Sequence, residues 1–150
     1  MARILFEFGV LKFMSALTLN GIYLSTSVSK SSIVNDVLEL ALFAFCIIIV
    51  GFRYGRRNTV LPSSGFCWAV AVLVLPVMLV TGIMVALILN TEDALAGLGT
   101  IASLSSEAYG FLIGFFLIIS AVYMVAGRLI FRFAAKRGTW KAAQDIHEAF

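Results

Sequence analysis

The chain has 150 residues, of which 61% are hydrophobic and 13% are charged, and its mean hydropathy is +1.04. Soluble domains average about 45–50% apolar and about 25% charged residues, so this composition excludes an ordinary soluble domain and indicates a membrane protein. The net charge of +3 does not indicate a nucleic-acid-binding protein, because the 11 basic residues do not gather on one soluble face.

Four apolar segments are each close to the length of about 20 residues that a helix needs to cross hydrocarbon. We therefore predict an all-α, polytopic membrane fold with short interfacial helices and a single membrane domain over residues 1–150. The predicted transmembrane helices cover residues 8–28, 33–51, 66–89 and 110–130.

The first segment, 8–28, could be taken for a secretory signal, but Glu7, Lys12 and Asn20 interrupt its apolar run. We expect it to be retained as the first transmembrane helix. Lys12 lies about one turn inside and is expected to extend its ammonium group to the lipid headgroups. Asn20 is expected to face another helix, because a side-chain amide in hydrocarbon needs a hydrogen-bonding partner.

The second segment carries two acidic residues, Asp36 and Glu39, which lie three apart and therefore on one face. Ionisable groups inside hydrocarbon are candidate functional groups, so this pair is a candidate ion or proton site. The alternative, which their place in the first two turns favours, is that both lie at the outer headgroups and stabilise the helix N-terminus.

A basic segment, Phe52–Gly65, follows and is expected to be a loop between the second and third helices. It contains Arg53, Arg56 and Arg57, whose expected role is to fix orientation, with lipid headgroups as their partners. Near the centre of the third helix, Pro76 predicts a kink, because proline removes one helical hydrogen bond.

Small residues at four-residue spacing are candidate helix-packing sites, namely Gly82 with Ala86 and Gly110 with Gly114. Such pairs serve either packing within the chain or contact with another one. The connection over residues 90–109 has roughly helical spacing of apolar residues and predicts a short interfacial helix.

The tail over residues 131–150 places Trp140, Ala143, Ile146 and Phe150 roughly along one side, between basic residues. This pattern predicts an amphipathic helix on an anionic membrane surface, separated from the fourth helix by a break at Gly138.

With four spanning helices, ten of the eleven basic residues fall on the side of the two termini. By the positive-inside rule, this bias predicts that both termini are cytoplasmic in a bacterial inner membrane. The ten residues are Arg3, Lys12, Arg53, Arg56, Arg57, Arg128, Arg132, Lys136, Arg137 and Lys141.

The sequence contains no phosphate-binding loop, no HExxH motif and no CxxC pair. Cys46 and Cys67 are expected to be small core residues, and His147, the only histidine, to be a solvated residue of the tail. We therefore expect no catalytic residue, metal site or cofactor, and no enzymatic activity.

The run Arg53-Tyr54-Gly55-Arg56-Arg57, followed by Leu61-Pro62-Ser63 and by Trp68, resembles a family of small four-helix bacterial inner-membrane proteins of unknown function. The basic close of the fourth helix, from Gly127-Arg128 to Lys136-Arg137, is similar too. This resemblance implies the fold and the location.

The expected function is association with another integral membrane protein, or with a second copy, as an accessory subunit or an inhibitor. The expected partners also include membrane lipids but not nucleic acid. One alternative is a small oligomeric transporter or channel in which Glu39, Asn20 and the Pro76 kink line a path. Another is an immunity protein against a pore-forming toxin, whose four-helix layout with cytoplasmic termini looks similar.

Overall fold

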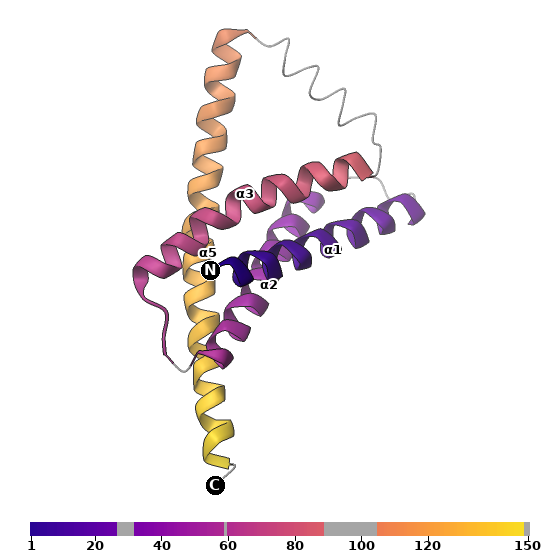
Figure 1. Cartoon of the computed structure of the whole chain (residues 1–150). Coiled ribbons are helices and arrows are strands. Elements are labelled where there is room, and N and C mark those ends of the chain that lie inside the picture. The colour runs from indigo at the N-terminus through magenta and orange to yellow at the C-terminus, as the bar shows by residue number, and fades with distance from the viewer. Residues whose placement is uncertain (27–31, 59, 89–104, 149–150) are drawn as a thin grey trace.

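The computed structural model describes residues 1–26, 32–58, 60–88 and 105–148, with the side chains of residues 22–26, 32–36, 86 and 107 left out (Figure 1). All regular secondary structure in the described residues is α-helical. Its helices are α1 (Ala2–Thr26), α2 (Ser32–Arg57), α3 (Ser64–Ile88) and α5 (Ser106–Glu148).

Three of these helices contain stretches that are long and apolar enough to cross a membrane, judged by length and composition. The stretches are Val37–Arg57 in α2, Ser64–Val85 in α3 and Ala108–Glu148 in α5. The described part of α1 is not among them. The prediction of an all-α membrane fold is thus confirmed, whereas a fourth span and the orientation of the chain stay predictions.

The three arginines of the expected loop lie instead on a helix, because α2 continues past Gly51 to Arg57. Arginine is a good helix former, and Pro62 is the first residue beyond Gly51 that excludes a helical conformation for its predecessor. Basic residues in the last turn also interact favourably with the helix dipole. Arg56 and Arg57 occupy this last turn.

The fourth helix does not end near residue 130, because α5 is one helix of 43 residues. At 1.5 Å per residue it is about 65 Å long, roughly twice the thickness of the hydrocarbon core. The expected separate surface helix over residues 131–150 is therefore, as far as residue 148, the second half of α5. The expected break at Gly138 is absent from this helix.

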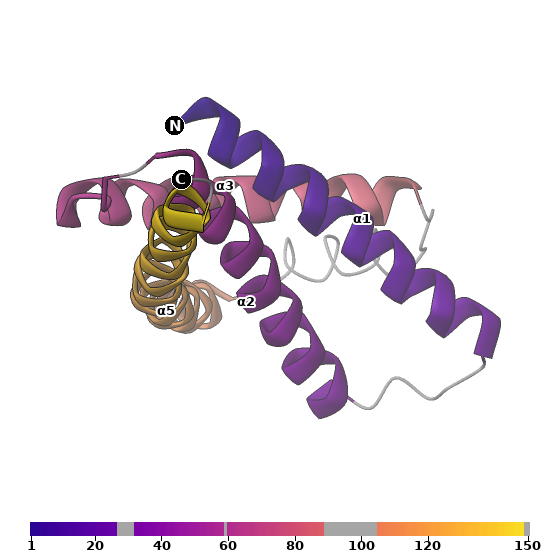
Figure 2. The same cartoon turned by 90° about the horizontal axis from the view of Figure 1, so that it is seen from below.

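The most extensive contact in the described chain is between α2 and α5, and α1 and α3 lie across this pair (Figures 1 and 2). The core at this crossing is apolar, and it includes both cysteines, which are buried as predicted. Its members are Ile4, Phe8, Phe43, Cys46, Ile47, Val50, Cys67, Val70, Val74 and Phe131.

Three glycines allow α2 and α5 to approach each other closely. A Cβ atom on Gly51 would lie 2.9 Å from the carbonyl oxygen of Phe131, and one on Gly55 would overlap the carbonyl oxygen of Ala135. From the side of α5, a Cβ atom on Gly138 would collide with the carbonyl oxygen of Phe52. Gly138 therefore continues the helix, and its missing side chain is what lets α2 fit.

Two further expectations concern α3 and the connection that follows it. Helix α3 continues on both sides of Pro76, so the proline does not end the helix, and the expected kink stays a prediction. The interfacial helix expected over residues 90–109 lies largely outside the described residues, and its last residues, 106–109, form the first turn of α5.

Candidate functional site

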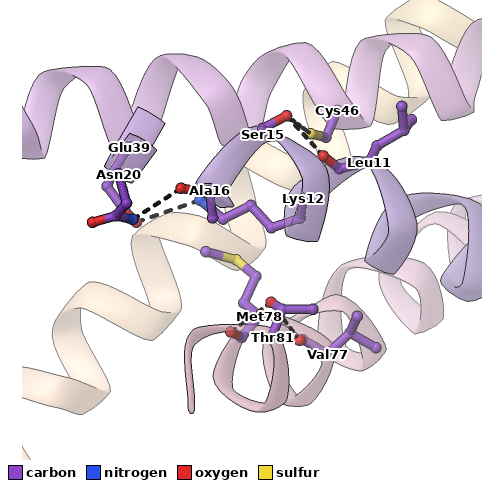
Figure 3. Close-up of polar contacts among 10 residues, drawn as sticks. All are labelled: Leu11, Lys12, Ser15, Ala16, Asn20, Glu39, Cys46, Val77, Met78 and Thr81. Carbon is purple, nitrogen blue, oxygen red and sulfur yellow. Dashed lines mark hydrogen bonds and ion pairs between the residues drawn. The ribbon is translucent and has the colours of Figure 1, made fainter. Parts of the chain in front are cut away.

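Two ionisable residues within the apolar helices, Lys12 and Glu39, meet where α1 crosses α2. Lys12 Nζ lies 3.4 Å from Glu39 Oε2 (Figure 3). The Lys12 side chain is 6% exposed, whereas that of Glu39 is 54% exposed. The ammonium group lies at a carboxylate of α2, because the crossing of the two helices brings an opposite charge within reach of a buried cation. The expected position of Lys12 at the lipid headgroups stays a prediction.

The polar side chains around this ion pair are hydrogen-bonded to their own helices (Figure 3). Ser15 Oγ donates to the carbonyl oxygen of Leu11 at 2.7 Å and lies 4.0 Å from Cys46 Sγ. Asn20 Nδ2 donates to the carbonyl oxygen of Ala16 at 2.9 Å. This bond lies within α1, and a contact of Asn20 with another helix stays a prediction.

On the α3 side of this region, the Thr81 hydroxyl lies 2.9 Å from the carbonyl oxygens of both Val77 and Met78. Thr81 is buried, and its hydroxyl is satisfied by the backbone of α3. It is therefore a packing residue whose polar atom is already paired.

Of the two acidic candidates, Glu39 faces Lys12, and the side chain of Asp36 lies outside the described residues. Within the described chain, no group of three His, Cys, Asp or Glu side chains is placed to hold a metal ion. The Lys12 to Glu39 pair is a neutral unit, so its chemical capacity is proton exchange or charge pairing between helices.

A second ionic cluster joins the start of α1 to the end of α2. Glu7 accepts hydrogen bonds from Arg57 Nη1 at 2.6 Å and from Arg3 Nε at 3.1 Å. The hydrogen bond from Arg57 is the main reason that the pKa of Glu7, which lies before the expected span 8–28, is held below its usual value of 4.5. Burial of the carboxylate opposes this shift.

Two of the arginines expected to contact lipid headgroups also have partners within the described chain. Arg57 pairs with Glu7, and Arg56 Nη2 donates to Asp145 Oδ2 of α5 at 2.9 Å. These contacts fasten the end of α2 to α1 and to the second half of α5. Arg53 is exposed and forms no ion pair with the described residues.

The basic residues of α5 differ in their surroundings. Arg128 Nη2 donates to Ser64 Oγ at 2.9 Å, and its guanidinium lies 4.6 Å from the centre of the Trp68 ring. Arg137 lies 5.3 Å from the centre of the Phe133 ring. Arg132 and Lys136 are exposed.

The glycines chosen from the sequence as helix-packing sites do not pack within the described chain. No atom lies within 4 Å of a Cβ built on Gly82, Gly110 or Gly114, and the side chain of Ala86 lies outside the described residues. The contact made at this spacing is that of Gly51 and Gly55. Gly51 and Gly55 have the GxxxG spacing in the sequence, and this signal could have identified them as a helix-packing site.

Two concave surfaces flank α1. An apolar groove of about 460 Å³ lies between α1 and α3, and a smaller cavity of about 300 Å³ contains the Glu7 cluster. The groove is lined by Leu5, Phe6, Gly9, Val10, Phe13, Met14, Val77, Thr81 and Met84. Its apolar lining provides no group that could carry out chemistry.

No protein-family model, curated protein or solved structure matches this chain. A functional assignment therefore rests on the contacts described above. They consist of one interior ion pair, a set of ionic contacts between helix ends, and a long helix of which one half is largely uncovered.

Proposed function

We propose that this protein is a non-enzymatic membrane protein that binds a transmembrane helix of another membrane protein, as an accessory subunit or an inhibitor. The observation that supports this proposal is the first half of α5. This segment is apolar on every side, and the described parts of α1, α2 and α3 leave most of it uncovered (Figure 1).

The exposure of this half of α5 is high around the whole helix. Phe111, Leu117 and Ile118 are 78%, 61% and 65% exposed. Lipid tails can cover such side chains, so exposure alone does not require a protein partner. The feature that favours a helix is the open backbone at Gly110 and Gly114, one turn apart on the same face.

The chain itself shows how it uses this spacing. Gly51 and Gly55 are four residues apart, and α5 lies against them so closely that neither position has room for a Cβ atom. Within hydrocarbon, helices associate through such close packing rather than through the hydrophobic effect. Gly110 and Gly114 present the same spacing on α5, and the partner we propose for them is another helix.

The proposed location is a bacterial inner membrane, with four spanning helices and both termini in the cytoplasm. The charge bias of the sequence supports this orientation, and the pairing of Lys12 with Glu39 lowers the cost of placing α1 in hydrocarbon. A reporter fused to either terminus should be active only in the cytoplasm. Periplasmic activity of either fusion would refute this topology.

The proposed association can be tested by cross-linking in native membranes. A photoreactive residue at Phe111 should give one cross-linked product that contains a second membrane protein in stoichiometric amount. Gly110→Leu and Gly114→Leu should abolish this product, because each leucine fills the open face.

Gly82→Leu is the matched control, because Gly82 is equally open but lies on α3. It should leave the cross-linked product unchanged. The absence of any protein product from the Phe111 probe would refute the proposal, and a product with twice the mass of the chain would replace the partner with a second copy.

The Lys12 to Glu39 pair supports a second candidate, an oligomeric transporter or channel for protons or ions. In this function Glu39 would exchange its partner Lys12 for the transported cation. Reconstituted vesicles should then show a flux that Glu39→Gln abolishes. A flux that is unchanged in Glu39→Gln and in Asn20→Ala would remove this candidate.

A further inference from the structure

Three side chains from α3 and α5 meet at Arg128. Its guanidinium lies 4.6 Å from the centre of the Trp68 ring, and its Nη2 donates to Ser64 Oγ at 2.9 Å. Stacking on an indole ring and a hydrogen bond to a hydroxyl both fix the plane of a guanidinium. Arg128 is therefore held in one orientation with several of its five N–H donors unused.

The positive charge of Arg128 is not neutralised by the described chain. Glu7 is paired with Arg3 and Arg57, and Asp145 is paired with Arg56. Arg128 forms no ion pair with the described residues, and its Nε atom is buried without a hydrogen-bond partner among them. A partly buried cation without a counter-ion is unfavourable, and binding an anion would lower this cost.

A second cation lies one turn further along α5. Arg132 is exposed and, like Arg128, forms no ion pair with the described residues. The two arginines are four residues apart and therefore on the same face of the helix.

The surface beside these arginines is apolar on one side. Trp68 is 38% exposed, and two further exposed apolar residues are Val72, one turn along α3 from Trp68, and Leu129, which follows Arg128 in α5. Trp is enriched where hydrocarbon meets the headgroups, because its ring is apolar and its N–H is polar. An anion bound here would therefore have apolar surface next to its charged group.

We propose that Arg128, together with Trp68, Ser64 and Arg132, binds the phosphate group of an anionic lipid. The planar guanidinium is suited to bind two phosphate oxygens at once. Arg132 adds a second cation, which favours a lipid with net negative charge over a zwitterionic one. The exposed Trp68, Val72 and Leu129 contact the acyl chains, and for this reason the ligand is a lipid and not free phosphate. This site is independent of the helix partner proposed for α5.

The test uses Trp68 as the probe. Trp68 and Trp140 are the two tryptophans of the chain, so Trp140→Phe leaves Trp68 as the sole tryptophan. This variant is reconstituted in vesicles of phosphatidylcholine that contain a minor fraction of phosphatidylglycerol with brominated acyl chains. Quenching of Trp68 should exceed that expected from the bulk lipid fraction and correspond to an affinity about tenfold higher than for brominated phosphatidylcholine, because the choline of phosphatidylcholine neutralises its phosphate whereas phosphatidylglycerol is a net anion.

Substitutions of individual arginines identify the site. Arg128→Gln should reduce the preference to that of bulk lipid, and Arg128→Lys should retain part of it, because the charge stays while the planar geometry is lost. Arg132→Gln should lower the preference without abolishing it. Arg137→Gln is the matched control, because Arg137 also lies over an aromatic ring of α5, and it should leave the preference unchanged.

Equal preference in Arg128→Gln and in Arg137→Gln, both with native helix content by circular dichroism, would overturn the proposal. If Arg128→Gln does not fold, the same decision rests on Arg132→Gln and Arg128→Lys, and unchanged quenching in both would overturn it. Loss of the excess quenching on addition of millimolar inorganic phosphate, at constant ionic strength, would show a site for free phosphate and refute the lipid assignment.

Discussion

The crossing of α2 and α5 predicts that Gly55 cannot accept even a methyl group. A Cβ atom at this position would overlap the carbonyl oxygen of Ala135 and would lie 2.9 Å from Thr139 N. Both are backbone atoms of a helix, and they cannot turn aside as the end of a flexible side chain can. Gly55→Ala must therefore move the two helices apart.

The size of the effect follows from two opposing contributions. Alanine favours the helical conformation over glycine by about 1 kcal/mol. Against this, inserting a methyl group where there is no room costs about 1–3 kcal/mol and occasionally more. Separation of the helices would also weaken the close contacts at Gly51 and Gly138. We expect Gly55→Ala to lower the free energy of unfolding by a net amount of about 1–2 kcal/mol.

The measurement is equilibrium unfolding in mixed micelles, followed by circular dichroism as the fraction of denaturing detergent rises. Gly114→Ala is the matched control, because it adds the same methyl group to a helix at a position with no atom within 4 Å. It should leave the stability unchanged or raise it by up to about 1 kcal/mol. Gly55→Ala is thus expected to lower the stability, and Gly114→Ala is not.

A Gly55→Ala variant as stable as the wild type, or more stable, would refute the close approach of α2 to α5. Equal losses in Gly55→Ala and Gly114→Ala would refute the reasoning in another way. In that case the loss would arise from the change of residue type and not from contact between the helices.

Three further predictions concern charges and the core. Because the pKa of Glu7 is lower in the folded protein than its usual value of 4.5, ionised Glu7 stabilises the folded state at pH values above 4.5. This stabilisation is lost as the pH falls through the pKa of Glu7 in the folded protein. The stability difference between wild type and Glu7→Gln, measured by thermal melting, should therefore be largest near neutral pH and vanish in acid. Glu39→Gln should lower the free energy of unfolding by up to roughly 3 kcal/mol, because it leaves the buried ammonium of Lys12 unpaired. Lys12→Met should lower it by about 1 kcal/mol or less. Equal losses for the two variants, measured by unfolding in detergent, would contradict the burial of Lys12. Phe131→Ala should lower stability by about 3–5 kcal/mol, whereas Phe133→Ala should cost little, because Phe131 is buried between α2 and α3 and Phe133 is exposed.

The class of fold could be predicted from hydropathy, because long apolar runs have few structural solutions in a membrane. The approximate positions of the helices followed from the same runs. Their ends did not, because charged residues stop an apolar run without stopping a helix. Arg53, Arg56 and Arg57 interrupt the apolar run, yet α2 continues to Arg57. The same reason explains why α5 extends beyond residue 130.

The contacts between helices were less accessible to prediction. Glycine spacing predicts packing at Gly110, Gly114 and Gly82, which are open. The helices meet instead at Gly51 and Gly55, which have the same four-residue spacing. Spacing identifies a position where close approach is allowed, but the position used depends on which helices are neighbours. That information lies in the packing of α2 on α5 rather than in either segment alone.

The Lys12 to Glu39 pair joins residues 27 positions apart on different helices. The position of each residue along its own helix predicts that Lys12 and Glu39 lie on different sides of the membrane. The crossing of α1 and α2 instead brings the two side chains together (Figure 3). The residue pattern of a single helix does not predict where that helix crosses another one.

The ionic contacts of α1 have a consequence for the order of events during synthesis. Within the expected span and its first flanking residue, the charged residues of α1 are Glu7 and Lys12, and both find their opposite charge on α2. When α1 first emerges from the ribosome, Glu7 can pair with Arg3 of the same helix, but Glu39, the partner of Lys12, has not been made. Alone, α1 would bring an uncompensated lysine into hydrocarbon, whereas paired with α2 it does not. We therefore expect α1 to wait at the insertion machinery and to enter the membrane together with α2 as a helical hairpin.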